Sequence, residues 1–185
     1  MTMPEGRPLV LIGFMASGKT TVGRLLAGRL GLPFVDLDDR IVERAGKTIP
    51  ELFRQIGETG FRQLEASALA DLLADPALRV IAGGGGLVLR RSNRILLRKR
   101  AFTVFLDASF PEVRRRLRRD GGGRPLADNL ASPQLGELYE DRRAIYRDAA
   151  DLRIPADGAP SEIVKDIIMM YISSQGRLEK SGRKR

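Results

Sequence analysis

The chain has 185 residues, which suffices for one domain with a full hydrophobic core. It contains neither cysteine nor histidine, so disulfides, thiolate metal sites and the commonest general base are excluded. The net charge is +9, of which +4 comes from the tail that begins at Gln175. Because only 5% of the residues are aromatic, this positive charge favours phosphorylated small molecules over nucleic acid as partners. The apolar runs are too short to span a membrane.

The first 30 residues contain the most specific motif of the chain. Met1 to Arg7 carry no apolar signal segment, so we expect a cytoplasmic protein. Apolar residues 9–12 then predict a buried strand, and residues 21–30 predict a helix. Between them, Gly13 to Thr20 match the G-x-x-x-x-G-K-[ST] phosphate-binding loop, in which backbone N–H groups and the helix end cradle phosphates. This order predicts an ATP- or GTP-binding protein rather than a glycine-rich turn that binds nothing.

Strand and helix patterns alternate along the rest of the chain. Further strands are expected at 33–36, 79–82, 103–106 and 152–154, and helices at about 49–74, 110–119, 133–149 and 161–173. The helix at 49–74 is expected to break near Gly57 and Gly60, since glycine weakens helix interiors. The alternation predicts an α/β fold with a doubly wound, five-stranded parallel sheet and helices on both faces.

Two segments differ in character from the rest. Residues 120–131 combine three successive glycines with Arg124-Pro125-Leu126, which predicts a mobile lid carrying one arginine toward the phosphates, with a plain linker as the alternative. Residues 175–185 are basic and are expected to be disordered.

Asp36 and Asp38 close the second expected strand. The two-residue period of a strand puts both carboxylates on one side, while Leu37 faces the core. At the carboxyl edge of a parallel sheet they would lie beside the phosphate loop, one near Mg²⁺ and the other accepting hydrogen from an acceptor hydroxyl. The alternative is that Asp38 or Asp39 caps the next helix.

Arginines and glycines supply the remaining candidates. Arg62 precedes Glu65 by three residues on a helix, so the carboxylate can orient the guanidinium for a substrate carboxylate, although such a pair is also a common surface salt bridge. Arg142 is a second candidate for a substrate anion. Residues 83–86 are four glycines after the third strand, and their backbone N–H groups can approach a ligand closely.

Taken in order, these motifs resemble shikimate kinases from about Pro8 to Tyr171. Besides the phosphate loop and the D-x-D of Asp36 and Asp38, the shared elements are G-E-x-x-F-R-x-x-E at 57–65, a triple glycine at 84–86, R-P-L at 124–126 and an R-x-P-x-Y element at 142–146. The resemblance implies ATP-dependent phosphorylation of the shikimate 3-hydroxyl, with Mg²⁺ as cofactor. It further implies a single P-loop kinase domain over residues 1–174. We expect a monomer with ATP and shikimate as partners, and neither nucleic acid nor membrane.

The resemblance also implies individual roles. The residues that would bind ATP are Ala16, Ser17, Gly18, Lys19, Thr20, Thr21, Arg116, Arg124 and Asp157, with Arg116 packed on the adenine and the loop of Asp157 lying along it. Those that would bind shikimate are Asp38, Arg62, Gly84, Gly85, Gly86 and Arg142. Thr20 and Asp36 would hold the metal. Lys19, Asp38 and Arg124 would be catalytic: Lys19 on the β- and γ-phosphates, Asp38 as the base, and Arg124 against the migrating phosphoryl group.

Three residues depart from the family pattern. Ala16 stands where glycine is common, which is tolerable unless its φ is positive, and Leu87 stands where a small residue is usual. Ala144 replaces a proline beside Arg142 and removes a rigid φ there.

Two other functions remain open at this point. The first is that of another small P-loop kinase, acting on gluconate or a nucleoside monophosphate. The D-x-D and the two arginines favour an acidic polyol over a nucleotide as the acceptor. A ligand-sensing domain without turnover is the other; such a regulator would carry a DNA-binding module, for which we expect no room before Leu9.

Overall fold

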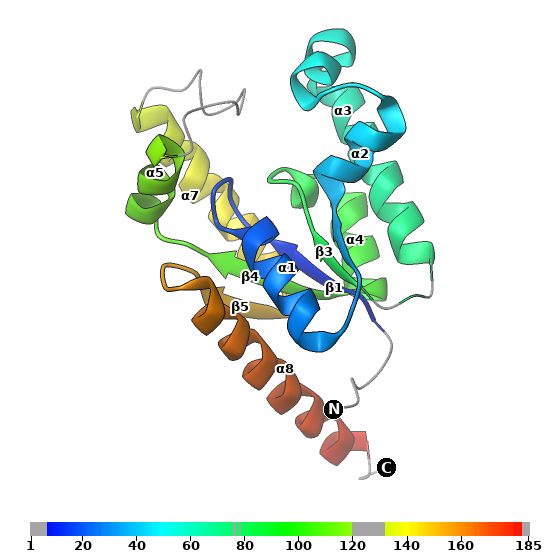
Figure 1. The fold of residues 1–185 in the computed structure, drawn as a ribbon, viewed down its shortest axis with the longest axis vertical. Coiled ribbons are helices and arrows are strands. Elements are labelled where there is room, and N and C mark those ends of the chain that lie inside the picture. Colours follow the sequence, from blue (N-terminus) through cyan, green and yellow to red (C-terminus); the bar gives the residue numbers. More distant parts are fainter. Residues whose placement is uncertain (1–6, 76, 78, 120–131, 183–185) are drawn as a thin grey trace.

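The computed structural model describes residues 7–75, 77, 79–119 and 132–182. Five strands form one parallel sheet in the order β2-β3-β1-β4-β5 (Figure 1). Their bounds are Leu9–Ile12 for β1, Phe34–Asp36 for β2, Val80–Ala82 for β3, Phe102–Asp107 for β4 and Leu152–Pro155 for β5. The predicted doubly wound parallel sheet is therefore confirmed, with β1 at the point where the strand order reverses.

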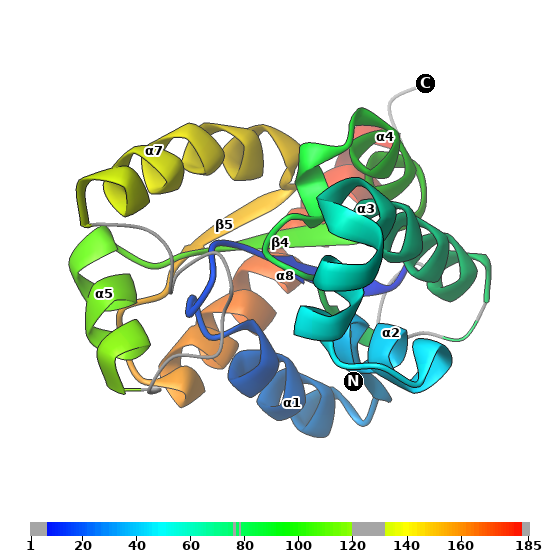
Figure 2. The same ribbon diagram turned by 90° about the horizontal axis from the view of Figure 1, so that it is seen from above.

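Helices cover both faces of the sheet. They are α1 (Lys19–Leu30), α2 (Leu37–Ala45), α3 (Ile49–Ala74), the 3₁₀ turn η1 (Leu87–Leu89), α4 (Arg91–Arg100), α5 (Phe110–Arg119), α7 (Ser132–Ala149) and α8 (Pro160–Gly182). Figure 2 shows α1 and α8 on one face and α3, α4 and α7 on the other. Because both faces are covered, every residue of β1, β3 and β4 is buried, as their apolar sequences require.

Helix α2 corrects the expectation for Asp38. Strand β2 ends at Asp36, whose side chain caps α2 by accepting a hydrogen bond from the backbone N–H of Asp38 at 3.0 Å. Asp38 therefore lies in the first turn of a helix and not on the strand, while Leu37 is fully buried as expected. An aspartate that bonds the N–H two residues further on favours a cap over a continuing strand.

Two helix boundaries also differ from expectation. Helix α3 breaks at Gly57 (φ 67°, ψ 179°), whereas Gly60 remains within the regular helix. The backbone of α8 stays helical to Gly182, past the expected end at residue 173 and into the tail expected to be disordered. No proline interrupts this segment, and the helix propagates from the turns that bury Ile163, Ile167 and Tyr171.

The predicted lid and Arg124, at residues 120–131, lie outside the described residues. Within the part of the chain that is described, no helix combines the length and the apolar character needed to cross a membrane.

Candidate active site

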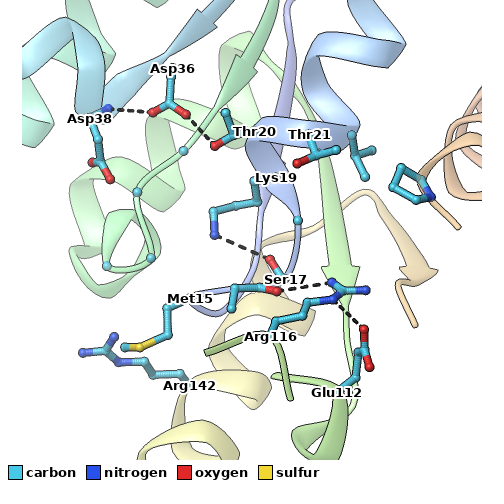
Figure 3. A pocket seen from close by; sticks show the side chains of 18 of the residues that line it. Met15, Ser17, Lys19, Thr20, Thr21, Asp36, Asp38, Glu112, Arg116 and Arg142 are labelled. Atoms are coloured by element: carbon cyan, nitrogen blue, oxygen red, sulfur yellow. Dashed lines mark hydrogen bonds and ion pairs between the residues drawn. The ribbon is translucent and has the colours of Figure 1, made fainter. Parts of the chain in front are cut away.

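One cavity of about 750 Å³ lies where β1, β2 and β3 end. Its walls come from the phosphate loop, α2, α3, the glycine turn after β3, α5, α7 and the loop between β5 and α8 (Figure 3). The predicted site residues that line it are Ala16, Ser17, Gly18, Lys19, Thr20, Thr21, Asp36, Asp38, Arg62, Gly84, Gly85, Gly86, Arg116, Arg142 and Asp157. The fold thus gathers segments more than 140 residues apart in the chain around one space.

The phosphate loop joins β1 to α1 and presents the start of that helix to the cavity. Gly18 precedes α1 in a left-handed conformation (φ 94°), and no acidic residue occupies the first turn. The Nζ atom of Lys19 donates to the carbonyl oxygens of Gly13 and Phe14, each at 3.0 Å. A positive helix end and an ammonium group held over the loop make this a strong anion site.

Ala16 carries backbone strain within that loop. It is the one non-glycine residue with positive φ (58°) among the described residues. For a residue with a Cβ atom this conformation costs about 1–2 kcal/mol. The methyl group at position 16 is therefore accommodated at a cost that glycine would avoid.

Thr20 and Asp36 form an oxygen pair beside the loop. The Thr20 hydroxyl donates to Asp36 Oδ2 at 2.7 Å. Among the described residues, no cluster of three or more histidine, cysteine or acidic side chains could hold a metal alone. Mg²⁺ in phosphoryl-transfer sites needs only one or two protein oxygens, because waters and phosphates complete its shell. The pair fits Mg²⁺ that arrives with a nucleotide.

Arg62 lies between two carboxylates of α3. Its guanidinium pairs with Glu65 at 3.0 Å and with Glu58 at 3.2 Å, and its side chain is only 11% exposed. A Cβ atom on Gly86 would overlap this guanidinium, and one on Gly84 would overlap the Glu65 carboxylate. Glycine at positions 84 and 86 therefore leaves room for the Glu65 and Arg62 side chains against the turn. This is a second reason for glycine there, besides the close backbone approach to a ligand that we predicted.

Glu65 is completely buried. Burial raises the pKa of its carboxyl to about 7, and the Asp38 carboxylate adds to the rise, while Arg62 and Arg142 oppose it. Oε2 accepts the Arg62 hydrogen bond, and Oε1 has no hydrogen-bond partner among the described residues. The part of the cavity beside the glycine turn thus holds a carboxyl group whose pKa is near 7.

Arg142 reaches the same part of the cavity from α7. It is only 7% exposed, and Tyr146, one turn later, donates its hydroxyl hydrogen to the Gly85 carbonyl. Burial raises the pKa of Tyr146 to about 12, so the phenol keeps that proton. Helix α7 runs without a break through Ala144. Arg142 therefore lines the cavity with Ala144, where the resemblance led us to expect proline, inside an unbroken helix.

Arg116 of α5 and Asp157 of the loop after β5 also line the cavity. In Figure 3, Lys19 lies between the side of Asp36 and Asp38 and the side of Arg116 and Glu112. The Asp157 carboxylate accepts a hydrogen bond from the backbone N–H of Ser109 at 2.7 Å, which fixes the loop after β5. Lys19 of the phosphate loop thus lies between two groups of charged side chains.

Sequence reasoning overlooked several lining residues. Hydrogen bonds from Arg115 and Arg116 lower the pKa of Glu112 to about 2, so it is a permanent anion of the wall. Its spacing of four residues from Arg116 was a usable signal. Phe53 and Phe61 also line the cavity, with ring centroids 4.6 Å apart. The break at Gly57 between them conceals their helical period.

Comparisons with known proteins point to one family. The family model described as Shikimate kinase matches residues 15–171. The chain is 45% identical over 174 residues to a shikimate kinase from Geobacter sulfurreducens, covering 93% of this chain and 94% of that protein. It resembles the structure of a shikimate kinase from Acinetobacter baumannii in complex with shikimate, with a TM-score of 0.84, 36% identity, and coverage of 91% and 94% of the two chains. A gluconokinase from Sinorhizobium meliloti has a TM-score of 0.57 over 95% and 97% of the chains, but at 17% identity that likeness shows the fold alone.

Proposed function

Since the chain belongs to the shikimate kinase family, we propose that it transfers the γ-phosphoryl group of ATP to the 3-hydroxyl of shikimate, giving shikimate 3-phosphate and ADP. One observation carries the proposal. A single cavity joins a phosphate loop at a helix start to two arginines suited to a carboxylate, the half-buried Arg62 and the buried Arg142. A triphosphate and an acidic polyol can therefore meet in one space.

At the nucleotide end, the loop amides and Lys19 bind the β- and γ-phosphates. Lys19 exchanges its bonds to the Gly13 and Phe14 carbonyls for phosphate oxygens, which are stronger acceptors for an ammonium group. Charge that develops on the transferring group is then stabilised by donors already in position. The resemblance implies that Arg124, outside the described residues, would add a further cation against the transferring group.

At the acceptor end, Arg62 and Arg142 bind the shikimate carboxylate, and the turn Gly84–Gly86 contacts the ring. Asp38 accepts the proton of the 3-hydroxyl as the oxygen attacks the γ-phosphorus. Its position in the first turn of α2 is fixed by the cap from Asp36. Asp38 is thus held by a rigid element at the carboxyl edge of the sheet.

Thr20 and Asp36 would hold Mg²⁺, with Asp36 acting through water. When bound, the ion would neutralise phosphate charge. The remaining expectations, a monomeric cytoplasmic enzyme with no nucleic-acid partner, stay predictions. Neither alternative function gains support: the likeness to a gluconokinase is one of fold only, and Lys19 and Asp38, to which we assign roles in turnover, both line the cavity.

A coupled assay of ADP release tests the function. The purified protein is given ATP and Mg²⁺ with shikimate, gluconate, AMP or no acceptor. We expect turnover with shikimate alone. Turnover with gluconate or AMP instead would assign another small-molecule kinase. ATP binding without turnover on any acceptor would favour the sensor.

A further inference from the structure

Arg116 of α5 uses all three nitrogens of its guanidinium. Nε donates to Glu112 at 2.6 Å, one terminal nitrogen donates to the Ala16 carbonyl at 3.2 Å, and the other donates to the Ala156 carbonyl at 2.7 Å. The side chain is only 14% exposed. Its conformation is therefore set by contacts within the protein.

The two carbonyls belong to segments 140 residues apart. Ala16 lies in the phosphate loop, and Ala156 begins the loop after β5. The guanidinium also lies against Gly18, because a Cβ atom there would be 3.4 Å from one of its terminal nitrogens. Arg116 consequently contacts the second half of the phosphate loop at two points.

These contacts exceed what packing on a base requires. An arginine that only stacks on adenine presents the flat face of its guanidinium, and its edge needs no partner in the phosphate loop. Here the edge bonds the carbonyl of Ala16, the residue held at positive φ. The direction of that carbonyl depends on the strained turn, so the hydrogen bond opposes its relaxation.

We propose that Arg116 is a positioning residue for the phosphate loop: through the Ala16 carbonyl it holds the turn 16–18 ready for phosphate, and through the Ala156 carbonyl it ties that turn to the loop after β5. The inference rests on the proposed ATP-binding function and deepens it. It differs from adenine packing in one respect that can be measured. Phosphate binding depends on Arg116 even when the ligand has no base.

The test measures the affinity of inorganic tripolyphosphate and of ATP by calorimetry. The variants are Arg116→Met, which keeps an apolar stem, and Arg116→Lys, which keeps the charge but cannot reach both carbonyls. Arg118→Met, an exposed position on the same helix and outside the cavity, is the control for lost positive charge. We expect tripolyphosphate affinity to fall about tenfold in Arg116→Met and about fivefold in Arg116→Lys, with little change in Arg118→Met.

A second measurement separates positioning from charge. If Arg116 opposes relaxation at Ala16, its removal has less effect when residue 16 adopts positive φ without strain. In the Ala16→Gly background we therefore expect Arg116→Met to weaken tripolyphosphate binding less than it does in the wild-type background. Should Arg116→Met fail to fold, Arg116→Lys is compared in the two backgrounds instead.

The results also separate this inference from the proposed function. Loss of ATP affinity with unchanged tripolyphosphate affinity, in either Arg116 variant, would overturn the positioning role and leave adenine packing. Equal losses of tripolyphosphate affinity in the wild-type and Ala16→Gly backgrounds would likewise overturn the positioning role. In either case, shikimate turnover by the wild-type protein would still support the proposed function. A wild-type protein that bound neither ligand would overturn both.

Discussion

The substitution Glu65→Gln removes the buried carboxyl group at the acceptor end of the cavity. The pKa of Glu65 rises from an ordinary 4.5 to about 7 because burial penalises its charged form. Each pKa unit corresponds to about 1.4 kcal/mol, so the pH-dependent part of its effect on stability is about 3 kcal/mol. Glutamine has nearly the same size and shape but does not titrate.

The sign follows from proton binding. Between pH 4.5 and about 7 the folded protein keeps the Glu65 proton, whereas the unfolded chain has released it. Folding stability from this residue is thus fully present below pH 4.5 and is lost as the pH rises through about 7. Relative to Glu65→Gln, the wild-type free energy of unfolding should fall by about 3 kcal/mol across this window.

Chemical denaturation of both proteins at several pH values between 4.5 and 8.5 measures this difference. Titration of all other groups largely cancels, because it is common to the two proteins. The matched control is Glu58→Gln, which removes the exposed partner of the same arginine, Arg62. A difference between wild type and Glu65→Gln that stayed constant with pH would refute the assignment of the raised pKa to Glu65.

Four further substitutions test the proposed roles. Lys19→Ala should lower kcat by at least about 100-fold with the fold intact, because a preorganised cation on the phosphates is lost; retained activity would remove Lys19 from the mechanism. Asp38→Asn should lower kcat by about 100-fold or more through loss of the base, and an unchanged kcat would leave Asp38 a structural residue of α2. Arg62→Ala should chiefly raise KM for shikimate, so a defect confined to ATP affinity would contradict its role. Gly86→Ala should raise the same KM, because its methyl group displaces the Arg62 guanidinium; an unchanged KM would show that the guanidinium does not need this position.

Much of the fold follows from local signals in the sequence. Strand β1, the phosphate loop and α1 were predictable because the motif requires a strand before it and a helix after it. Helix α4 escaped prediction because five of its ten residues are basic and only Asn93 and Leu97 are buried, which leaves almost no apolar period. Asp38 was misassigned because strand and helix patterns both allow a buried Leu37 between two aspartates.

The site was predictable as a set of residues and less so as a set of contacts. Spacing indicated that Arg62 and Glu65 pair, and they do. The pKa of Glu65 depends on burial by segments distant in the chain, which no local pattern encodes. The hydrogen bonds of Arg116 reach residues 40 and 100 positions away, so no local pattern in the sequence indicates them. Its assignment to adenine therefore came from the resemblance alone.

The glycine turn after β3 also constrains how this sequence can diverge. A Cβ atom at position 86 would overlap the Arg62 guanidinium, and one at position 84 would overlap the Glu65 carboxyl group, so a larger residue at either position requires that side chain of α3 to move or to be replaced. Within each pair the two substitutions are expected to appear jointly in descendants of this sequence. A descendant that kept Arg62 but acquired a bulky residue at position 86 would need another arrangement of side chains to bind the substrate carboxylate.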